Sequence, residues 1–178
     1  MISKEKYNEL AKKMADCLRE NKIVLTDAQK ADIEVADFGL GEVDTIGLQI
    51  YVYVNTDRVC AKELYLIPGQ MCPEHRHPAI DGSPGKEETF RCRAGTVYLY
   101  VPGEATPNPS CKPNGTVVTV WHEVILNPGD QYTLYPDTLH WFQAGEAGAI
   151  VTEFSTKSVD GADIFTDTRI VREPEVMA

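Results

Sequence analysis

The chain has 178 residues, of which 43% are hydrophobic and 25% are charged, as is usual for a globular protein with a single core. Its 17 Lys and Arg residues against 27 Asp and Glu residues give a formal net charge of −10. This acidity argues against nucleic acid and anionic membranes as partners, because both attract basic surfaces. No apolar stretch has the length of a membrane-spanning helix, and the first residues lack the apolar run of a signal peptide.

The cysteine content favours a reducing compartment. The five cysteines are odd in number and include no CxxC pair, so neither a disulfide framework nor a zinc knuckle is expected. Free thiols without a signal peptide predict a cytoplasmic protein. Cys72 lies close to two histidines in sequence, but a small apolar filler is the more common role for such a residue.

The first 45 residues are predicted to be helical. Apolar residues recur at helical spacing over residues 3–21, and Thr26 opens a capping box that predicts a second, short helix. Gly39 and Gly41 are expected to end that helix. We expect residues 1–45 to pack on the outside of the domain that follows.

From residue 47 the hydrophobic pattern changes to a period of two, which is typical of strands. About nine short strands separated by turn residues predict an antiparallel sandwich or barrel over residues 46–156. Residues 102–115 are expected to form an exposed loop, and residues 157–178 an irregular segment near the barrel mouth. No linker divides the chain, so one domain is expected. Besides the histidine strand, strands are predicted over 48–54, 59–67, 88–93, 96–101, 117–126, 131–135, 139–142 and 149–154.

One stretch, residues 69–95, contains the side chains of a metal site. His75 and His77 are one residue apart, so in a strand they lie on the same face. Glu88 follows on the next predicted strand, on the face opposite to Glu87. Imidazole and carboxylate ligands together suit manganese, iron, cobalt, nickel or zinc.

The spacing of these residues resembles the first signature of the cupin family, whose members are small jelly-roll β-barrels that hold a metal. The resemblance implies His75, His77 and Glu88 as metal ligands, and a second, weaker signature implies His140 as the fourth. The gap of ten residues between His77 and Glu88 is longer than in the family pattern, which predicts a loop over residues 78–86 at the barrel mouth. The two patterns are Gly69-x5-His75-x-His77-x10-Glu88-x6-Gly95 and Gly129 followed by Pro136-Asp137-Thr138-Leu139-His140.

Longer phrases are similar to the D-lyxose ketol-isomerase family of cupin-type sugar isomerases. The resemblance implies a metal-dependent aldose–ketose isomerase that interconverts D-lyxose and D-xylulose, and also D-mannose and D-fructose. It implies a monosaccharide substrate and Mn²⁺ as cofactor, with Co²⁺, Fe²⁺, Ni²⁺ or Zn²⁺ as substitutes. A homodimer is expected, since barrels with helical N-terminal arms often pair. The phrases are DFGLG at 37–41, YVNTDR at 53–58, KELYLIPGQ at 62–70, CPEHRHP at 72–78, GKEETFRCR at 85–93, HWFQAGE at 140–146 and DIFTD at 163–167.

Isomerisation also needs an acid–base group, for which Glu153 is the candidate. Glu153 interrupts an apolar strand, where an inward carboxylate is costly unless it is paired or used. The alternative is that Glu153 faces solvent. Lys62 is the candidate for protonating or hydrogen-bonding the substrate oxygens, with an edge-strand lysine as the alternative.

Four further residues are candidate substrate contacts. Asp163, Phe165 and Arg169 lie in the C-terminal segment that resembles the family's closing stretch over the barrel mouth. Asp163 could hold a sugar hydroxyl, and Arg169 could bind either Asp167 or substrate; the alternative for both is a solvated tail. Trp141 could stack on a sugar face, but it alternates with His140 and could instead point into packing.

Two other classes of function use the same ligands. An iron-dependent cupin dioxygenase would consume oxygen, whereas an isomerase would not. A non-catalytic sugar-binding cupin would bind the sugar without exchanging its C2 hydrogen with solvent. His122 fits neither signature and is expected to be a structural or surface residue.

Overall fold

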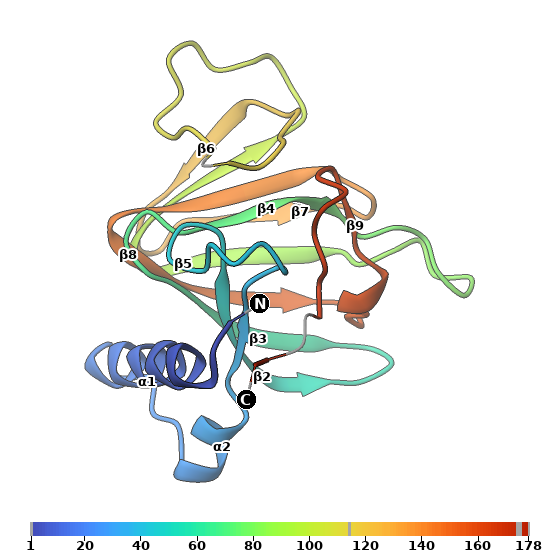
Figure 1. Cartoon of the computed structure of the whole chain (residues 1–178). Coiled ribbons are helices and arrows are strands. Elements are labelled where there is room, and N and C mark those ends of the chain that lie inside the picture. The colour runs from blue at the N-terminus through green and yellow to red at the C-terminus, as the bar shows by residue number, and fades with distance from the viewer. Residues whose placement is uncertain (1, 114, 174–175, 178) are drawn as a thin grey trace.

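The computed structural model describes residues 2–113, 115–173 and 176–177. Within them, two helices precede a set of antiparallel strands that curl into a barrel (Figure 1). The prediction of a mainly-β fold with N-terminal helices is confirmed. No helix of the described residues is both long and apolar enough to cross a bilayer. The elements are α1 (Lys4–Glu20), α2 (Asp27–Ala31), β1 (Glu34–Ala36), β2 (Leu48–Asn55), β3 (Cys60–Leu66), β4 (Met71–Arg76), β5 (Glu88–Val101), β6 (His122–Leu126), β7 (Gln131–Leu134), β8 (His140–Ser155), the short 3₁₀ helix η1 (Asp160–Ala162) and β9 (Ile164–Phe165).

The barrel is built around its two longest strands, β5 and β8. They pair with each other along almost their whole length, from Glu88 opposite Ser155 to Tyr100 opposite Trp141. On its other side β8 pairs first with β4 and then with β3, so one strand joins both halves of the barrel. The full order is β1-β2-β3-β8-β4-β9, with β6 and β7 attached to β5.

A glycine kink explains why the sequence predicts two strands where β5 is continuous. Gly95 has φ of +72°, and a Cβ there would lie 1.9 Å from the carbonyl oxygen of Gly148 on β8. Only glycine tolerates both the conformation and the contact. The predicted strands over 139–142 and 149–154 are likewise the two halves of β8, joined by a stretch that bulges away from β5.

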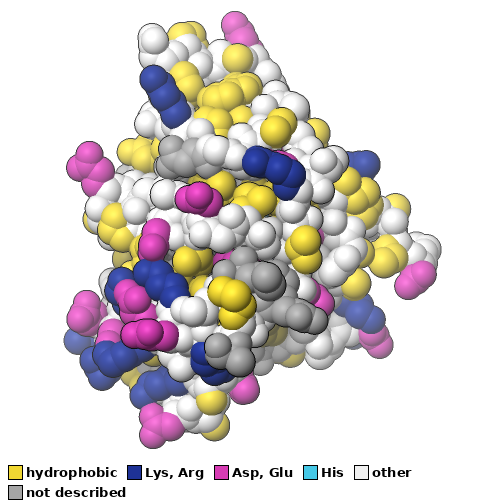
Figure 2. Space-filling model, viewed as in Figure 1, with side chains coloured by type: hydrophobic (Ala, Val, Ile, Leu, Met, Phe, Trp, Pro, Cys, Tyr) yellow, Lys and Arg dark blue, Asp and Glu magenta, His cyan; other side chains and the backbone are white. Residues whose placement is uncertain are grey.

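Helix α1 packs against the outside of the barrel, as its pattern predicts. Ser3 caps it by accepting a hydrogen bond from the Lys6 amide at 3.2 Å. Met14 and Leu18 are fully buried in a cluster with residues of β2 and β8. The outward face carries ion pairs of neighbouring turns, and Figure 2 shows charged side chains of both signs gathered over this helix.

The second helix is shorter than predicted. Thr26 forms the expected capping box, but α2 ends at Ala31, well before the glycines that were expected to end it. The chain then forms β1, which pairs antiparallel with the first residues of β2. Pairing with β2 satisfies backbone groups that a longer helix would have left exposed on that strand, so tertiary context overrides the local pattern.

Two loop segments meet at one side of the barrel. The predicted strand over 117–126 begins only at His122, because the residues before it run as a loop to Glu74 on β4. The C-terminal segment contributes β9, which pairs with the end of β4. The predicted irregular segment over 157–178 thus contains two short elements, and its residues 174–175 and 178 lie outside the described part of the chain.

Candidate metal centre

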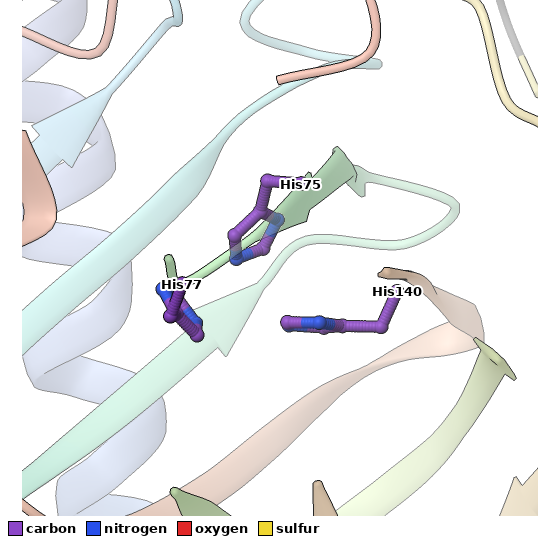
Figure 3. A group of neighbouring side chains, drawn as sticks. All are labelled: His75, His77 and His140. Carbon is purple, nitrogen blue, oxygen red and sulfur yellow. The ribbon is translucent and has the colours of Figure 1, made fainter. Parts of the chain in front are cut away.

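Three histidines converge inside the barrel (Figure 3). His75 on β4 lies opposite His140 on β8 in the antiparallel ladder, and His77 follows two residues after His75 on the same face. All three are buried, and one ring nitrogen from each lies within 4.8 Å of the other two. The strand register therefore brings together the histidines that the two sequence patterns single out.

Each imidazole has its Nδ1 held by an oxygen acceptor, which leaves Nε2 for the shared space. Metal-binding histidines in proteins typically show such a contact at the second nitrogen. The Nε2 of His140 is buried and makes no hydrogen bond of good geometry, although the Glu88 carboxylate lies 3.1 Å away. The three contacts are His75 to the Pro73 carbonyl at 2.9 Å, His140 to the Thr138 carbonyl at 2.9 Å, and His77 to Asp163 Oδ1 at 2.5 Å.

Glu88, the first residue of β5, lies beside the histidines. Its Oε1 lies 3.2 Å from His77 Nε2 and 3.1 Å from His140 Nε2, and its Oε2 lies 2.6 Å from Lys86 Nζ. Burial alone would raise the pKa of this carboxyl, but Lys86 and His77 hold the pKa well below its usual value. Glu87 is exposed. Three imidazoles and one ionised carboxylate fit a divalent transition metal.

The histidines differ in their own titration. Burial lowers the pKa of His75 well below its usual value, and the neighbouring imidazoles of His140 and His77 lower it further. Burial also lowers the pKa of His77, but Glu88 and Asp163 outweigh it and raise the pKa to about 9. In the absence of a metal, His77 therefore binds a proton more tightly than His75 does.

A chain of opposite charges extends from Glu88 along the cavity wall. Glu153 is 3% exposed and lies 3.0 Å from Lys86 Nζ and 4.0 Å from Lys62 Nζ. Lys62 lies directly opposite Glu153 in the β3–β8 ladder and donates at 2.9 Å to both Asp160 carboxylate oxygens and to Ser158. The structure thus brings the candidate base and candidate lysine together, facing inward.

Three charged residues of this site were missed from the sequence. Lys86 could have been found, since in an extended chain it shares the face of Glu88, two residues later. Asp160 and Arg172 gave no local signal, because their place depends on how the C-terminal segment docks. Arg172 lines the cavity, contacts Asp160 at 3.1 Å and also pairs with Glu34.

Of the predicted substrate contacts, Phe165 and Asp163 line the cavity. The ring of Phe165 lies 5.4 Å from that of His75, centre to centre. Asp163 does not point a free carboxylate at the cavity, because its Oδ1 is engaged by His77 Nδ1. Its evident contact is therefore with a histidine of the centre.

Trp141 and Arg169 do not line the cavity. Trp141 is fully buried on the opposite face of β8, where its ring stacks on Tyr100 at 3.8 Å and leaves no face for a sugar. Arg169 has a side chain that is 61% exposed and is bound to Asp167 through two nitrogens. The structure thus agrees with the alternatives for both residues: alternation along the strand turns Trp141 into packing, and Arg169 binds Asp167.

The cavity is narrow: a water-sized molecule can occupy about 40 Å³ of it, and about 400 Å³ is free of protein atoms when the solvent at its opening is included. Apolar side chains such as Phe38, Leu64 and Phe142 form part of its wall. A second hollow shares His77, Lys86 and Asp163 with it and is bordered by the loop over 78–86. This loop therefore lies next to the part of the cavity that His77 and Lys86 line.

Comparison with known proteins gives close relatives among curated sequences, although no family model matches the chain. The D-lyxose/D-mannose isomerase of Thermosediminibacter oceani is 60% identical over 179 residues, which cover 99% of both chains. The D-lyxose ketol-isomerase of a Thermofilum species is 55% identical and covers 99% of this chain and 100% of the relative. That of Cohnella laeviribosi is 51% identical and covers 96% of this chain and 95% of the relative.

Solved structures support the fold. The L-ribose isomerase of Geodermatophilus obscurus superimposes with a TM-score of 0.77 at 17% identity, covering 94% of each chain. That of Cellulomonas parahominis gives a TM-score of 0.77 at 17% identity, covering 99% of this chain and 98% of the other. The prediction of a cupin-type barrel is confirmed. With identities of 51–60% over nearly the whole length, the chain belongs to the D-lyxose ketol-isomerase family.

Proposed function

We propose that this protein is a metal-dependent aldose–ketose isomerase that interconverts D-lyxose and D-xylulose, and also D-mannose and D-fructose. The observation that carries the proposal is the 60% identity, over 99% of the chain, to a protein named D-lyxose/D-mannose isomerase. The barrel interior supports it, because a cluster of metal-binding side chains lies beside a buried carboxylate. A metal-dependent isomerase that works by proton transfer would use both.

His75, His77, His140 and Glu88 are the proposed ligands of a divalent cation, with Mn²⁺ as the leading candidate and Co²⁺, Fe²⁺, Ni²⁺ or Zn²⁺ as substitutes. When bound, such a cation would draw electron density from the oxygens at C1 and C2 of the sugar and make the C2 hydrogen more acidic. The Nδ1 contacts fix the three rings, so the nitrogens facing the ion need no reorganisation.

Glu153 is the proposed base. Isomerisation moves one hydrogen from C2 to C1 and one from O2 to O1. The Glu153 carboxylate takes the C2 hydrogen as a proton and delivers it to C1. Lys86 lies 3.0 Å from that carboxylate, and Lys62 supplies a hydrogen-bond donor to substrate oxygens from the same wall.

Deuterium exchange tests the reaction and the base together. The metal-free protein is loaded with Mn²⁺ and incubated with D-lyxose in D₂O, and NMR follows the sugars. Formation of D-xylulose carrying deuterium at C1 is the expected result. Deuterium at C1 requires that the proton taken by Glu153 exchanges with solvent before it is delivered, so any incorporation would contradict a direct shift of hydrogen from C2 to C1. Absence of any ketose across a panel of aldoses and divalent metals would contradict the isomerase.

Removal of the metal provides a second test. Dialysis against a chelator should abolish activity, and Mn²⁺ should restore it. Full activity in metal-free protein would contradict the metal-dependent mechanism. A parallel measurement of dissolved oxygen excludes a dioxygenase if no oxygen is consumed during turnover.

We further propose that the protein works in the cytoplasm as a homodimer. The five free cysteines support the location, because free thiols are typical of a reducing compartment. The packing of a helical N-terminal segment on the outer face of the barrel supports the assembly. Light scattering coupled to gel filtration should give twice the mass of 19.8 kDa, and a monomer mass would contradict it.

A further inference from the structure

Glu74, next to the metal-site histidines in sequence, is fully buried, and in the described part of the chain it forms no ion pair. Its carboxylate is instead surrounded by hydrogen-bond donors. Oε2 accepts from the backbone amides of Thr119 at 2.7 Å and Val120 at 2.9 Å. Oε1 accepts from the hydroxyls of Thr119 at 2.7 Å and Thr166 at 2.6 Å. Four donors compensate for burying this charge without a cation.

These donors come from two separate segments. Thr119 and Val120 belong to the loop that precedes β6, whereas Thr166 follows directly after β9. The backbone of Glu74 adds a further bond, since its carbonyl accepts from the Thr166 amide at 3.1 Å. Thr166 is therefore held to β4 through both the main chain and the side chain of one residue, Glu74.

The segment that Thr166 ends is in contact with the metal centre. It contains Asp163, which engages Nδ1 of His77 at 2.5 Å, and Phe165, whose ring packs against that of His75. Glu74 alternates with His75 along β4, so it holds this segment from the far face of the strand. The position of Asp163 relative to His77 thus depends on a contact outside the cavity.

We propose that Glu74 is a positioning residue for the metal centre, which acts by fixing Thr166 and thereby the segment that places Asp163 on His77. The inference rests on the metal site of the proposed function, but metal binding can be measured without turnover. Loss of an outer partner of a metal-binding histidine typically weakens metal binding about 10- to 100-fold. Glu74 acts on His77 only through Thr166 and Asp163, so loss of its contact with Thr166 should weaken metal binding by about tenfold.

Two matched variants separate positioning from general stability. Thr166→Val and Thr119→Val each remove one hydroxyl donor from the same oxygen of Glu74, with almost no change in side-chain volume. Only Thr166 belongs to the segment that carries Asp163. The dissociation constant for Mn²⁺ is measured on metal-free protein by electron paramagnetic resonance of the free ion, and denaturant unfolding is measured in parallel.

Thr166→Val should weaken Mn²⁺ binding about tenfold. Thr119→Val should leave it within about twofold, although both variants lower the stability of the metal-free protein. Equal weakening in the two variants, or unchanged Mn²⁺ binding in Thr166→Val, would overturn the proposal, because a purely structural contact predicts those results.

Substitutions of Glu74 itself provide a rescue test. The glutamine oxygen of Glu74→Gln can accept from the two amides while its NH₂ donates to the two hydroxyls, which can reverse their roles. Glu74→Gln should therefore bind Mn²⁺ within a few-fold of the unchanged protein, whereas Glu74→Ala should lose more. Tighter binding in Glu74→Ala than in Glu74→Gln would contradict the inference. If Mn²⁺ binding follows these expectations but no aldose is isomerised, the positioning stands and the proposed reaction fails.

Discussion

Lys86 occupies an unusual position, because its ammonium contacts two carboxylates with different proposed roles. It lies 2.6 Å from Glu88, a proposed metal ligand, and 3.0 Å from Glu153, the proposed base. Burial would lower the pKa of Lys86, but Glu153 and Glu88 raise it well above its usual value. The lysine therefore stays charged, and it lowers the pKa of Glu88, which favours the ionised form that metal binding requires.

Glu153→Gln should lower kcat at least 100-fold and leave Mn²⁺ binding nearly unchanged, because it removes the proton acceptor but no proposed ligand. Steady-state assays with D-lyxose and metal titration give the two quantities. The matched control is Glu63→Gln, which neutralises another buried carboxylate on β3, bonded to Thr152 rather than lining the cavity. Normal turnover in Glu153→Gln would make Glu153 structural.

Glu63 predicts a pH effect on stability. It is 3% exposed, accepts from Thr152 and Tyr53, and has a raised pKa because burial outweighs these bonds and the nearby Arg93. The folded protein thus binds a proton that the unfolded chain releases near pH 4.5. The stabilisation is complete below that pH and is lost as pH rises through the folded-state pKa.

Relative to Glu63→Gln, the unchanged protein should therefore lose unfolding free energy as pH rises from 4.5 toward neutrality. Denaturant unfolding of both proteins at several pH values, without metal, measures the difference. A constant difference across this range would show that Glu63 titrates normally.

At the scale of elements, the alternation of side chains between the two faces of a strand decides which parts of the site can be predicted. His75 and His77 share a face because both lie in one extended stretch, and Glu88 is distinguished from Glu87 in the same way. That information is local, so the sequence contains it. Residues 117–121 are rich in valine and were expected to be a strand, yet they run to Glu74, because a buried carboxylate needed donors that this loop supplies.

The parts that could not be predicted depend on docking between distant segments. Asp160 and Arg172 enter the cavity only because the C-terminal segment folds back over the barrel mouth. The packing of Trp141 against Tyr100 likewise depends on a neighbouring strand whose register the sequence leaves open. Strand periodicity specifies a face, but not the partner that the face meets.

Gly69 and Gly95, the two glycines of the cupin pattern, give a matched test of the β5–β8 kink. Both have φ of +72°, but a Cβ at Gly69 meets nothing within 4 Å, whereas one at Gly95 would collide with the Gly148 carbonyl. Gly69→Ala should cost about 1–2 kcal/mol through backbone conformation alone. Gly95→Ala should cost clearly more, as measured by denaturant unfolding of the metal-free proteins. Equal costs would mean that β5 and β8 separate easily at the kink.

At the scale of the whole molecule, the charged groups around the cavity are paired before any ion is present. Lys62 and Lys86 oppose Glu88, Glu153 and Asp160 around one cavity. Burying a carboxylate is tolerated when a cation lies at hydrogen-bond distance, so the barrel does not need a metal to close.

The metal-free protein should therefore unfold cooperatively, and Mn²⁺ should raise its Tm. Binding to the folded state alone adds about 2.7 kcal/mol when the free ion is at 100 times its Kd. Calorimetry with and without Mn²⁺ tests both statements. An unfolded metal-free protein, seen by circular dichroism, would contradict the role given to the lysines.

The contacts of Lys86 with Glu88 and Glu153 also bear on which metal ion the protein binds in a cell. A metal site that is already folded before the ion binds cannot select its ion by folding around it. Which ion binds then depends on the chemistry of the ligands and on which metal ions the cell supplies. Imidazole-rich sites bind zinc and copper more tightly than manganese. Preparations from zinc-rich and manganese-rich cultures should thus differ in bound element and in specific activity while sharing one fold.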